Sequence, residues 1–251
     1  MRLTVIGCSG SYPGPESPAS CYLLEAEDEG RTWRILLDLG SGALGVLQQY
    51  VDPLSIDAVF LSHLHADHCL DLCGYYVLRK YHPDGAQPRI PVWGPEGTAD
   101  RMARAYDLPT TPGMNAEFDF RAYGDPVELG PFRVEPVPVV HPVSAYGLRI
   151  SADGTTVGYS GDTGPCEGLD RVAKDVDLLL AEASFRSGDD NPPDLHLTGA
   201  DGGGAATRGG ARRLLLTHVP PWFDREHAAA EARSVYDGPV ELARCGQTYD
   251  V

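Results

Sequence analysis

The sequence has little positive charge for its size. Among 251 residues, 20 Lys and Arg face 36 Asp and Glu, which gives a formal net charge of −16. Surfaces that bind extended nucleic acid usually carry the opposite sign, because phosphate contacts and counterion release drive their affinity. Extended nucleic acid is therefore a poor candidate partner.

Long apolar segments and a cysteine framework are missing too. No apolar run approaches the ~20 residues that a membrane-spanning helix needs. The chain enters an apolar stretch directly with MRLTVIG, without the charged leader of a signal peptide. The six cysteines are dispersed, which is typical of reduced thiols. We therefore expect a cytoplasmic protein without membrane contacts. Cys69 and Cys73 could share a helix face as half of a metal site, but no second pair supports this.

The composition supports a folded core made of short elements. Hydrophobic residues make up 42% of the chain, and 29 Gly and 21 Pro indicate many turns. The continuous LLL runs at 178–180 and 214–216 are typical of strands buried on both faces. The order of elements is strand-rich, then helical, strand-rich again, and finally alternating. We predict an α/β (α+β) protein with two packed sheets and helices outside them, in one domain over 1–251.

Individual elements follow from apolar periodicity and turn residues. Strands are predicted at 3–6, 22–26, 33–37, 58–61, 90–93, 117–123, 132–140, 146–150, 156–159, 178–181, 214–217 and 240–243. Helices are predicted at 42–50, 70–81, 97–106, 167–174, 200–208 and 225–236.

The decisive segment for function is HLHADH at positions 63–68, directly after the apolar strand AVFL. Neutral imidazoles and carboxylates are the ligands of Zn²⁺ and similar borderline metals. The i, i+2 spacing sends His63 and His65 to one side, whereas Asp67 and His68 can face a second site.

Four residues cannot complete two coordination spheres, so further ligands are expected at other strand ends. His141 follows VEPVPVV, Asp162 follows TVGYSG, and His218 follows RLLLT. His82 lies in a turn and His227 on a polar helix, and both are interpreted as surface histidines.

These motifs resemble the metallo-β-lactamase superfamily. The match comprises HLHADH, the earlier LLDLG at 36–40, His141, SGDT at 160–163 and LLLTH at 214–218. The resemblance implies a four-layer αβ/βα sandwich with a dinuclear metal site at one end. It assigns His63, His65 and His141 to the first metal, and Asp67, His68 and His218 to the second. Asp162 would bridge the two, and Asp38 would orient the ligand loop. Zn²⁺ suits these ligands, with Mn²⁺ or Fe²⁺ as alternatives.

Further motifs resemble the ribonuclease Z branch of that superfamily. They are GCSGSYPGP at 7–15, LAEASF at 180–185 and HLTG at 196–199. True β-lactamases have a cysteine at the second metal and lack the bridging aspartate, so antibiotic hydrolysis is disfavoured. The resemblance maps a catalytic pair onto Glu182 and His196. Two metals can activate a water for attack on phosphorus, and His196, oriented by Glu182, would protonate the leaving alkoxide.

The spacing between His141 and Asp162 bears on the substrate. Ribonuclease Z proteins usually carry a long tRNA-binding arm between these positions, whereas 21 residues leave no room for one here. The chain also resembles actinobacterial cyclic-nucleotide phosphodiesterases, in SHLHADHCLDL at 62–72, RKYHP at 79–83, PPDLHL at 192–197 and LLLTHVPPW at 214–222. A dinuclear phosphodiesterase acting on a small diester such as 3′,5′-cyclic AMP is therefore expected.

Several alternatives stay open from the sequence. They are tRNA 3′ processing, lactone or thioester hydrolysis, and a metal-dependent binding protein with vestigial chemistry. A homodimer is also possible from the resemblance.

Three further residues are candidates for contact with such a substrate. Arg79 and Lys80 could contact phosphate, although basic residues on a helix are usually solvated. Trp222 could stack a base or pack locally. The glycines at 202–204 lack the context of a phosphate-binding loop, so we expect a weak helix there.

Overall fold

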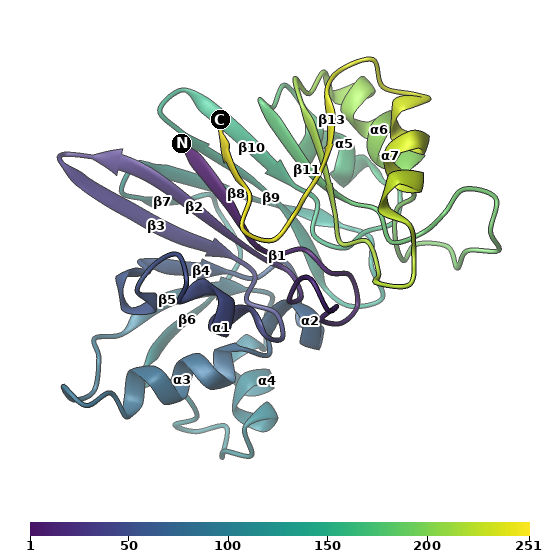
Figure 1. Cartoon of the computed structure of the whole chain (residues 1–251). Helices are drawn as coiled ribbons and strands as arrows, with labels where there is room; N and C mark the ends of the chain where they lie inside the picture. The colour runs from purple at the N-terminus through teal and green to yellow at the C-terminus, as the bar shows by residue number, and fades with distance from the viewer.

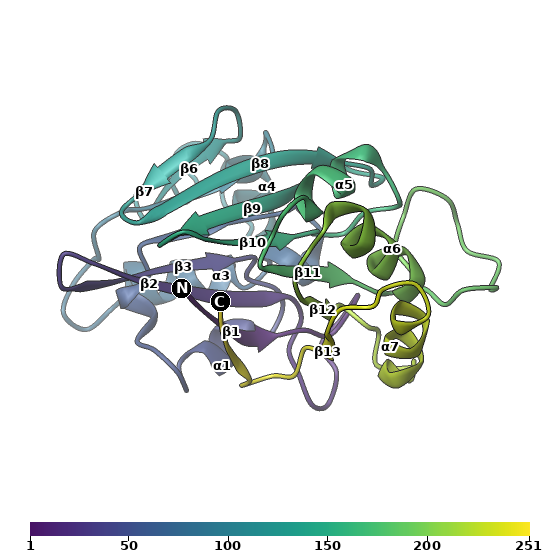
Figure 2. The ribbon, with the colours of Figure 1, turned by 90° about the horizontal axis from the view of Figure 1, so that it is seen from above.

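The computed structural model describes residues 1–251, and its two seven-stranded sheets pack face to face with helices outside each (Figures 1 and 2). This arrangement is the four-layer sandwich expected from the sequence. No helix combines the length and apolarity needed to cross a membrane.

The first sheet has the order β14-β1-β2-β3-β4-β5-β6. Its strands pair antiparallel from β14 to β3 and parallel from β3 to β6. They are β1 (Arg2–Gly7), β2 (Cys21–Asp28), β3 (Arg31–Leu37), β4 (Ala58–Phe60), β5 (Ile90–Gly94), β6 (Phe118–Ala122) and β14 (Thr248–Asp250). The helices of this half are α1 (Ala43–Leu47), a 3₁₀ turn at Pro53–Ser55, α2 (Ala66–Cys69), α3 (Leu72–Lys80) and α4 (Thr98–Ala105).

The second sheet has the order β13-β12-β11-β10-β9-β8-β7. It too divides into an antiparallel part, β7 to β10, and a parallel part, β10 to β13. Its strands are β7 (Val127–Leu129), β8 (Phe132–Val139), β9 (Ala145–Ala152), β10 (Thr155–Tyr159), β11 (Leu178–Glu182), β12 (Leu214–Thr217) and β13 (Val240–Leu242). The helices α5 (Glu167–Ala173), α6 (Gly199–Gly209) and α7 (Arg225–Arg233) cover its outer face (Figure 2).

The continuous leucine runs are explained by the period of a strand. Successive side chains point to opposite faces, so Leu178 and Leu180 join the core between the sheets. Leu179 lies in the other core, between the second sheet and its helices. In β12, Leu215 faces the first sheet and its neighbours face the helices. Each fully buried Leu contributes about 1.5–3 kcal/mol, which is why both faces of these strands are apolar.

The predicted elements agree with the structure except in a few places. Strands β7 and β14, of three residues each, were missed. Strand β7 has the same sequence VEL as β13, which was predicted, so the local pattern does not distinguish the two. The helix predicted at 70–81 begins at Leu72, and the separate short helix α2 precedes it. The glycine-rich stretch is indeed helical, as α6, and Thr198 caps it through a capping box with Asp201.

Candidate metal centre

Most polar residues of the site lie at the carboxyl ends of strands from both sheets, and His196 lies in the loop between β11 and α6. Strand β4 leads to the HLHADH segment, and β8 and β10 lead to His141 and Asp162. Strand β11 ends at Glu182, and His218 follows β12. Carboxyl ends of neighbouring parallel strands share one sheet edge, so residues far apart in sequence meet there.

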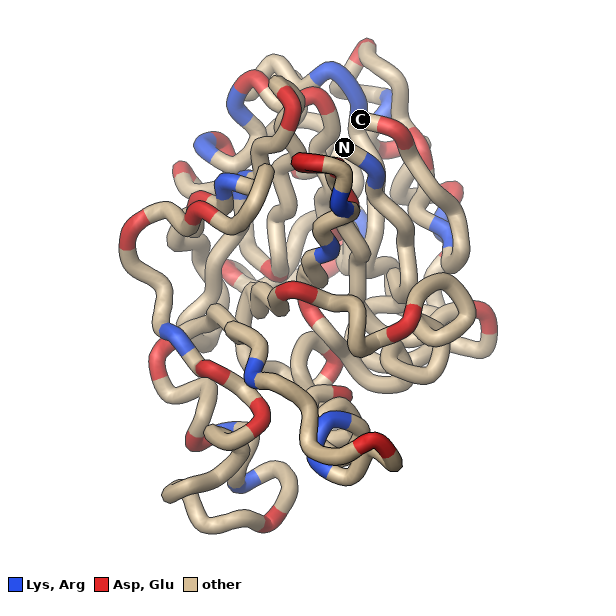
Figure 3. The backbone as a smooth tube through the Cα atoms, turned by 90° about the vertical axis from the view of Figure 1, so that its left-hand side faces the viewer, with Lys and Arg blue, Asp and Glu red and all other residues tan.

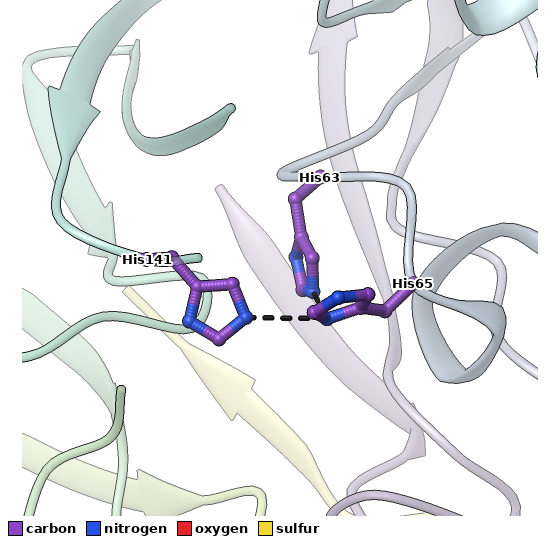
Figure 4. A group of neighbouring side chains, drawn as sticks. All are labelled: His63, His65 and His141. Carbon is purple, nitrogen blue, oxygen red and sulfur yellow. Dashed lines mark hydrogen bonds between the residues drawn. The ribbon is translucent and has the colours of Figure 1, made fainter. Parts of the chain in front are cut away.

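The first group consists of His63, His65 and His141 (Figure 4). The Nδ1 atom of His65 lies 3.0 Å from Nε2 of His63 and 3.2 Å from Nε2 of His141. The Nδ1 of His141 lies 2.9 Å from the carbonyl oxygen of Leu195 and donates to it in the neutral tautomer. Three ring nitrogens thus converge on one point.

The second group consists of Asp67, His68, Asp162 and His218. The Nε2 atoms of His68 and His218 are 3.1 Å apart, and Oδ2 of Asp67 is 3.2 Å from Nε2 of His218. Asp162 lies between the groups. Its Oδ2 is 3.3 Å from Nε2 of His68 and 3.8 Å from Nε2 of His63.

The tautomers of these imidazoles indicate that the groups fit cations. His68 donates through Nδ1 to Asp38, and His218 donates through Nδ1 to the Ser184 hydroxyl, at 2.7 Å each. The Ser184 hydroxyl itself donates to the carbonyl of His218, which leaves it able to accept from Nδ1. In neutral rings the two facing Nε2 atoms then both carry lone pairs, and such lone pairs repel unless a cation lies between them.

Asp38 anchors this arrangement from beneath and has no exposed surface. Its Oδ2 accepts from Nδ1 of His68 at 2.7 Å, the Tyr159 hydroxyl at 2.6 Å and the Ser62 hydroxyl at 2.8 Å. Its Oδ1 accepts from the Ser62 backbone N–H at 2.6 Å. This is the orienting role expected for Asp38 from the sequence.

Two of these residues have left-handed backbone conformations, which are unusual for residues other than glycine. Asp38 has φ +58° and His218 has φ +56°. Such conformations cost free energy and persist only where the surroundings enforce them. Here they let a strand end turn its polar side chain into the site.

Burial and neighbouring charges perturb the protonation of these groups. Burial lowers the pKa of His63 well below its usual value, and the nearby His68 adds to this. Burial alone would raise the pKa of Asp67, but hydrogen bonds from His218 and His68 outweigh it and lower that pKa. The direction for His63 favours neutral imidazole and that for Asp67 favours ionised carboxylate, the forms that bind metals. His68 differs: burial would lower its pKa, but Asp162 and Asp38 outweigh burial and raise that pKa well above its usual value.

A third group adjoins the second through His218 and contains Glu182 and His196. Glu182 is buried, and its Oε1 accepts from Nδ1 of His196 and from the Thr163 backbone N–H, both at 2.9 Å. Burial opposes protonation of His196, but Glu182 outweighs it and raises the pKa of His196 to about 9. The Nε2 atom of His196 has no hydrogen-bond partner in the structure, so it is free to act on a ligand.

All nine residues predicted for the site are therefore brought together at one end of the sandwich. The sequence reasoning missed the Ser62 and Ser184 hydroxyls, which fix ring orientations. Their one signal is a serine close in sequence to a site residue, as Ser62 is to His63 and Ser184 to Glu182, and that pattern is too common to be selective.

The other residues that the sequence suggested as phosphate contacts or metal ligands are not part of the ligand groups. Arg79 is 2% exposed and donates to the Tyr75 hydroxyl and the Pro88 carbonyl, so its suggested role as a phosphate contact was wrong. Lys80 donates to the Tyr76 hydroxyl at 2.6 Å on the same helix. Cys69 and Cys73 belong to none of the ligand groups, and the Cys69 thiol donates to the His65 carbonyl.

Comparison with known proteins identifies the family. Residues 33–219 match the model of the beta-lactamase superfamily domain. The chain belongs to this superfamily. It is a metallo-hydrolase of the β-lactamase fold with a cluster of metal-binding residues.

Several relatives align with this hydrolase over its whole length. An uncharacterized protein of Mycobacterium leprae is 45% identical, over 100% of this chain and 89% of its own. The probable metallo-hydrolase YhfI of Bacillus subtilis is 30% identical over the full length of both chains. A crystal structure of YhfI superposes with a TM-score of 0.87, covering 99% of this chain and 98% of that one at 28% identity.

A ribonuclease Z of Myxococcus xanthus is a further relative. It is 27% identical over 307 aligned positions, covering 100% of this chain and 98% of the ribonuclease. Because this chain has 251 residues, at least 307 − 251 = 56 of those positions have no counterpart here. The hydrolase therefore lacks segments that this ribonuclease contains.

Proposed function

We propose that this hydrolase is a phosphodiesterase that cleaves small diesters such as 3′,5′-cyclic AMP, yielding 5′-AMP. The observation that carries the proposal is the Glu182–His196 pair beside the two ligand groups. Such a pair can protonate the alkoxide that leaves a phosphodiester, whereas the thiolate that leaves a thioester needs no such proton.

We further propose that the two ligand groups hold two divalent ions, with Zn²⁺ as the first choice for imidazole and carboxylate ligands. Ions in such a pair polarise a phosphoryl oxygen and lower the pKa of water. In this assignment His63, His65 and His141 hold one ion, and Asp67, His68 and His218 hold the other. Asp162, between the groups, would contact both.

His196 would supply the proton that the reaction requires. The oxygen of water forms a bond to phosphorus and one of its protons passes to the solvent, while the bond from phosphorus to O3′ breaks. The electron pair stays on O3′, which takes a proton from Nε2 of His196. Glu182 accepts from Nδ1 at 2.9 Å and so stabilises the protonated ring while directing Nε2 outward. Asp67 would position the nucleophile as well as bind metal.

Charge and length favour a small diester over tRNA. The net charge is −16, and Lys and Arg are scattered among Asp and Glu along the backbone (Figure 3). The segment between His141 and Asp162 contains the strands β9 and β10, joined by a tight turn, with no arm between them. Processing of tRNA 3′ ends remains the second candidate, because a ribonuclease Z is among the relatives.

The test uses purified, metal-loaded protein with 3′,5′-cyclic AMP, bis(p-nitrophenyl) phosphate and a precursor tRNA as separate substrates. We expect turnover of both small diesters, lost in Asp67→Ala. His196→Ala should abolish turnover of cyclic AMP, which expels an alkoxide, and reduce that of bis(p-nitrophenyl) phosphate much less, because p-nitrophenolate leaves without a proton. His227→Ala is the matched control, because His227 is half exposed on α7 and pairs with Glu231. Turnover of the precursor tRNA alone would favour the second candidate. Activity on none of the three substrates, with metal bound, would refute the phosphodiesterase and direct attention to lactones and thioesters.

A further inference from the structure

Two large aromatic side chains stand exposed close to the metal centre. Tyr12 is 42% exposed and Trp222 is 59% exposed. Their ring centroids are 5.2 Å apart and their planes are inclined by 33°. Trp222 also packs edge-on against Phe223, with ring centroids 6.0 Å apart, and still leaves more than half of its surface exposed. Exposed aromatic rings of this kind are typical of binding surfaces, because their flat faces gain most from being covered.

The two loops that carry these rings are fastened to each other at His218. The His218 backbone N–H donates to the Cys8 carbonyl at 3.1 Å, and the Gly10 N–H donates to the Val219 carbonyl at 3.2 Å. A Cβ on Gly10 would lie 2.1 Å from the His218 carbonyl oxygen, so only glycine permits this approach. The backbone N of Ser11, next to Tyr12, is 3.4 Å from Nε2 of His218. The aromatic pair is thus held in place beside a candidate metal ligand.

His218 is a neighbour both of His196 and of the loop that carries Tyr12. The rings of His196 and His218 are 5.7 Å apart, and His218 connects His196 to the Tyr12 loop. His196 is the proposed donor to O3′. In a 3′,5′-cyclic nucleotide, O3′ remains on the ribose that also carries the base, so the base extends from the phosphorus on the side of O3′.

We propose that Tyr12 and Trp222 form a stacking site for the base of the substrate, and that they select nucleotide diesters over diesters without a planar ring. This inference rests on the proposed phosphodiesterase function and adds a specificity determinant to it. Stacking suits any base, because every base has a π-face, so the site would discriminate little among bases. Loss of one stacking partner typically weakens binding by about 5- to 150-fold.

The test measures binding by calorimetry on the metal-loaded protein and does not depend on turnover. The ligands are 5′-AMP and ribose 5-phosphate, which share the sugar phosphate and differ in the base. We expect 5′-AMP to bind at least about tenfold more tightly. Trp222→Ala should remove about tenfold of the 5′-AMP affinity and leave the ribose 5-phosphate affinity unchanged. Trp222→Phe should restore most of the loss, and Tyr12→Ala should act in the same direction as Trp222→Ala.

The control is Tyr81→Ala, an exposed aromatic at the end of α3 that is 65% exposed. It should leave both affinities unchanged. Equal affinity for the two ligands, no measurable 5′-AMP binding, or unchanged 5′-AMP affinity in Trp222→Ala would each overturn the inference. Failure of cyclic AMP hydrolysis with a retained, Trp222-dependent preference for 5′-AMP would overturn the proposed reaction and leave the stacking site standing.

Discussion

Replacing Asp38 by Asn is expected to weaken both the fold and the metal centre. The carboxylate is fully buried and accepts four hydrogen bonds, three at Oδ2 and one at Oδ1. Asn keeps the shape and loses the charge. An amide has one accepting oxygen, so its NH₂ group must face either the Ser62 backbone N–H or the three donors at Oδ2.

The expected loss of stability follows from the less costly of these two orientations of the amide, in which only the Ser62 backbone N–H lacks an acceptor. One buried donor without an acceptor costs about 1–3 kcal/mol, and exchanging charged for neutral hydrogen bonds adds about 1 kcal/mol. The free energy of unfolding should therefore fall by about 2–4 kcal/mol. His68 would also lose the carboxylate that fixes its tautomer, and loss of such a partner typically costs 10–100-fold in metal affinity.

Urea denaturation of the metal-free protein measures the first effect, and Zn²⁺ titration against a chromophoric chelator measures the second. Asp57→Asn is the matched control. Asp57 accepts from the Arg34 backbone N–H at 2.8 Å, but it precedes β4, whereas the metal centre follows that strand. It should leave Zn²⁺ affinity unchanged. Wild-type Zn²⁺ affinity in Asp38→Asn would refute the view that this carboxylate sets the geometry of His68.

Three further predictions concern stability. Removing metal with a chelator should lower Tm by about 5–10 °C, because a ligand at 100 times its Kd adds about 2.7 kcal/mol and each kcal/mol shifts Tm by about 2–4 °C; an unchanged Tm in calorimetry would argue against a metal-stabilised fold. Leu215→Ala, between the sheets, should cost about 2–5 kcal/mol in urea denaturation, and Val235→Ala, 44% exposed, should stay within about 0.5 kcal/mol. In α6, Gly204→Ala should raise the unfolding free energy by about 0.5–1 kcal/mol, since a Cβ there meets only the flexible end of Arg208. Gly203→Ala should lower it, since its Cβ would lie 2.7 Å from the Ala232 carbonyl oxygen, and a stabilised Gly203→Ala would contradict this packing.

The glycine-rich helix illustrates what the sequence could and could not predict. Composition alone indicates that glycines weaken a helix by about 1 kcal/mol each. The structure supplies the compensation, because α6 and α7 approach so closely that a Cβ on Gly199 would lie 2.0 Å from the Ala228 carbonyl oxygen. The loss of helix stability at each glycine can be predicted from the sequence. The close packing of the two helices that glycine allows joins residues 29 positions apart, Gly199 and Ala228, and is seen only in the structure.

The same distinction separates the predicted from the missed parts of the site. His141, Asp162 and His218 were predictable because each is a lone ligating residue after an apolar strand, and strand ends meet at one edge of a sheet. The orientation of each ring depends instead on a single contact to a group of common type, such as the Ser184 hydroxyl. The stacking role proposed for Trp222 rests likewise on its exposure and on its distance from Tyr12. Residue type and local pattern therefore identify which side chains can bind a metal. The tautomer of each histidine and the residues around the site depend on contacts between loops that are far apart in sequence, such as those at His218.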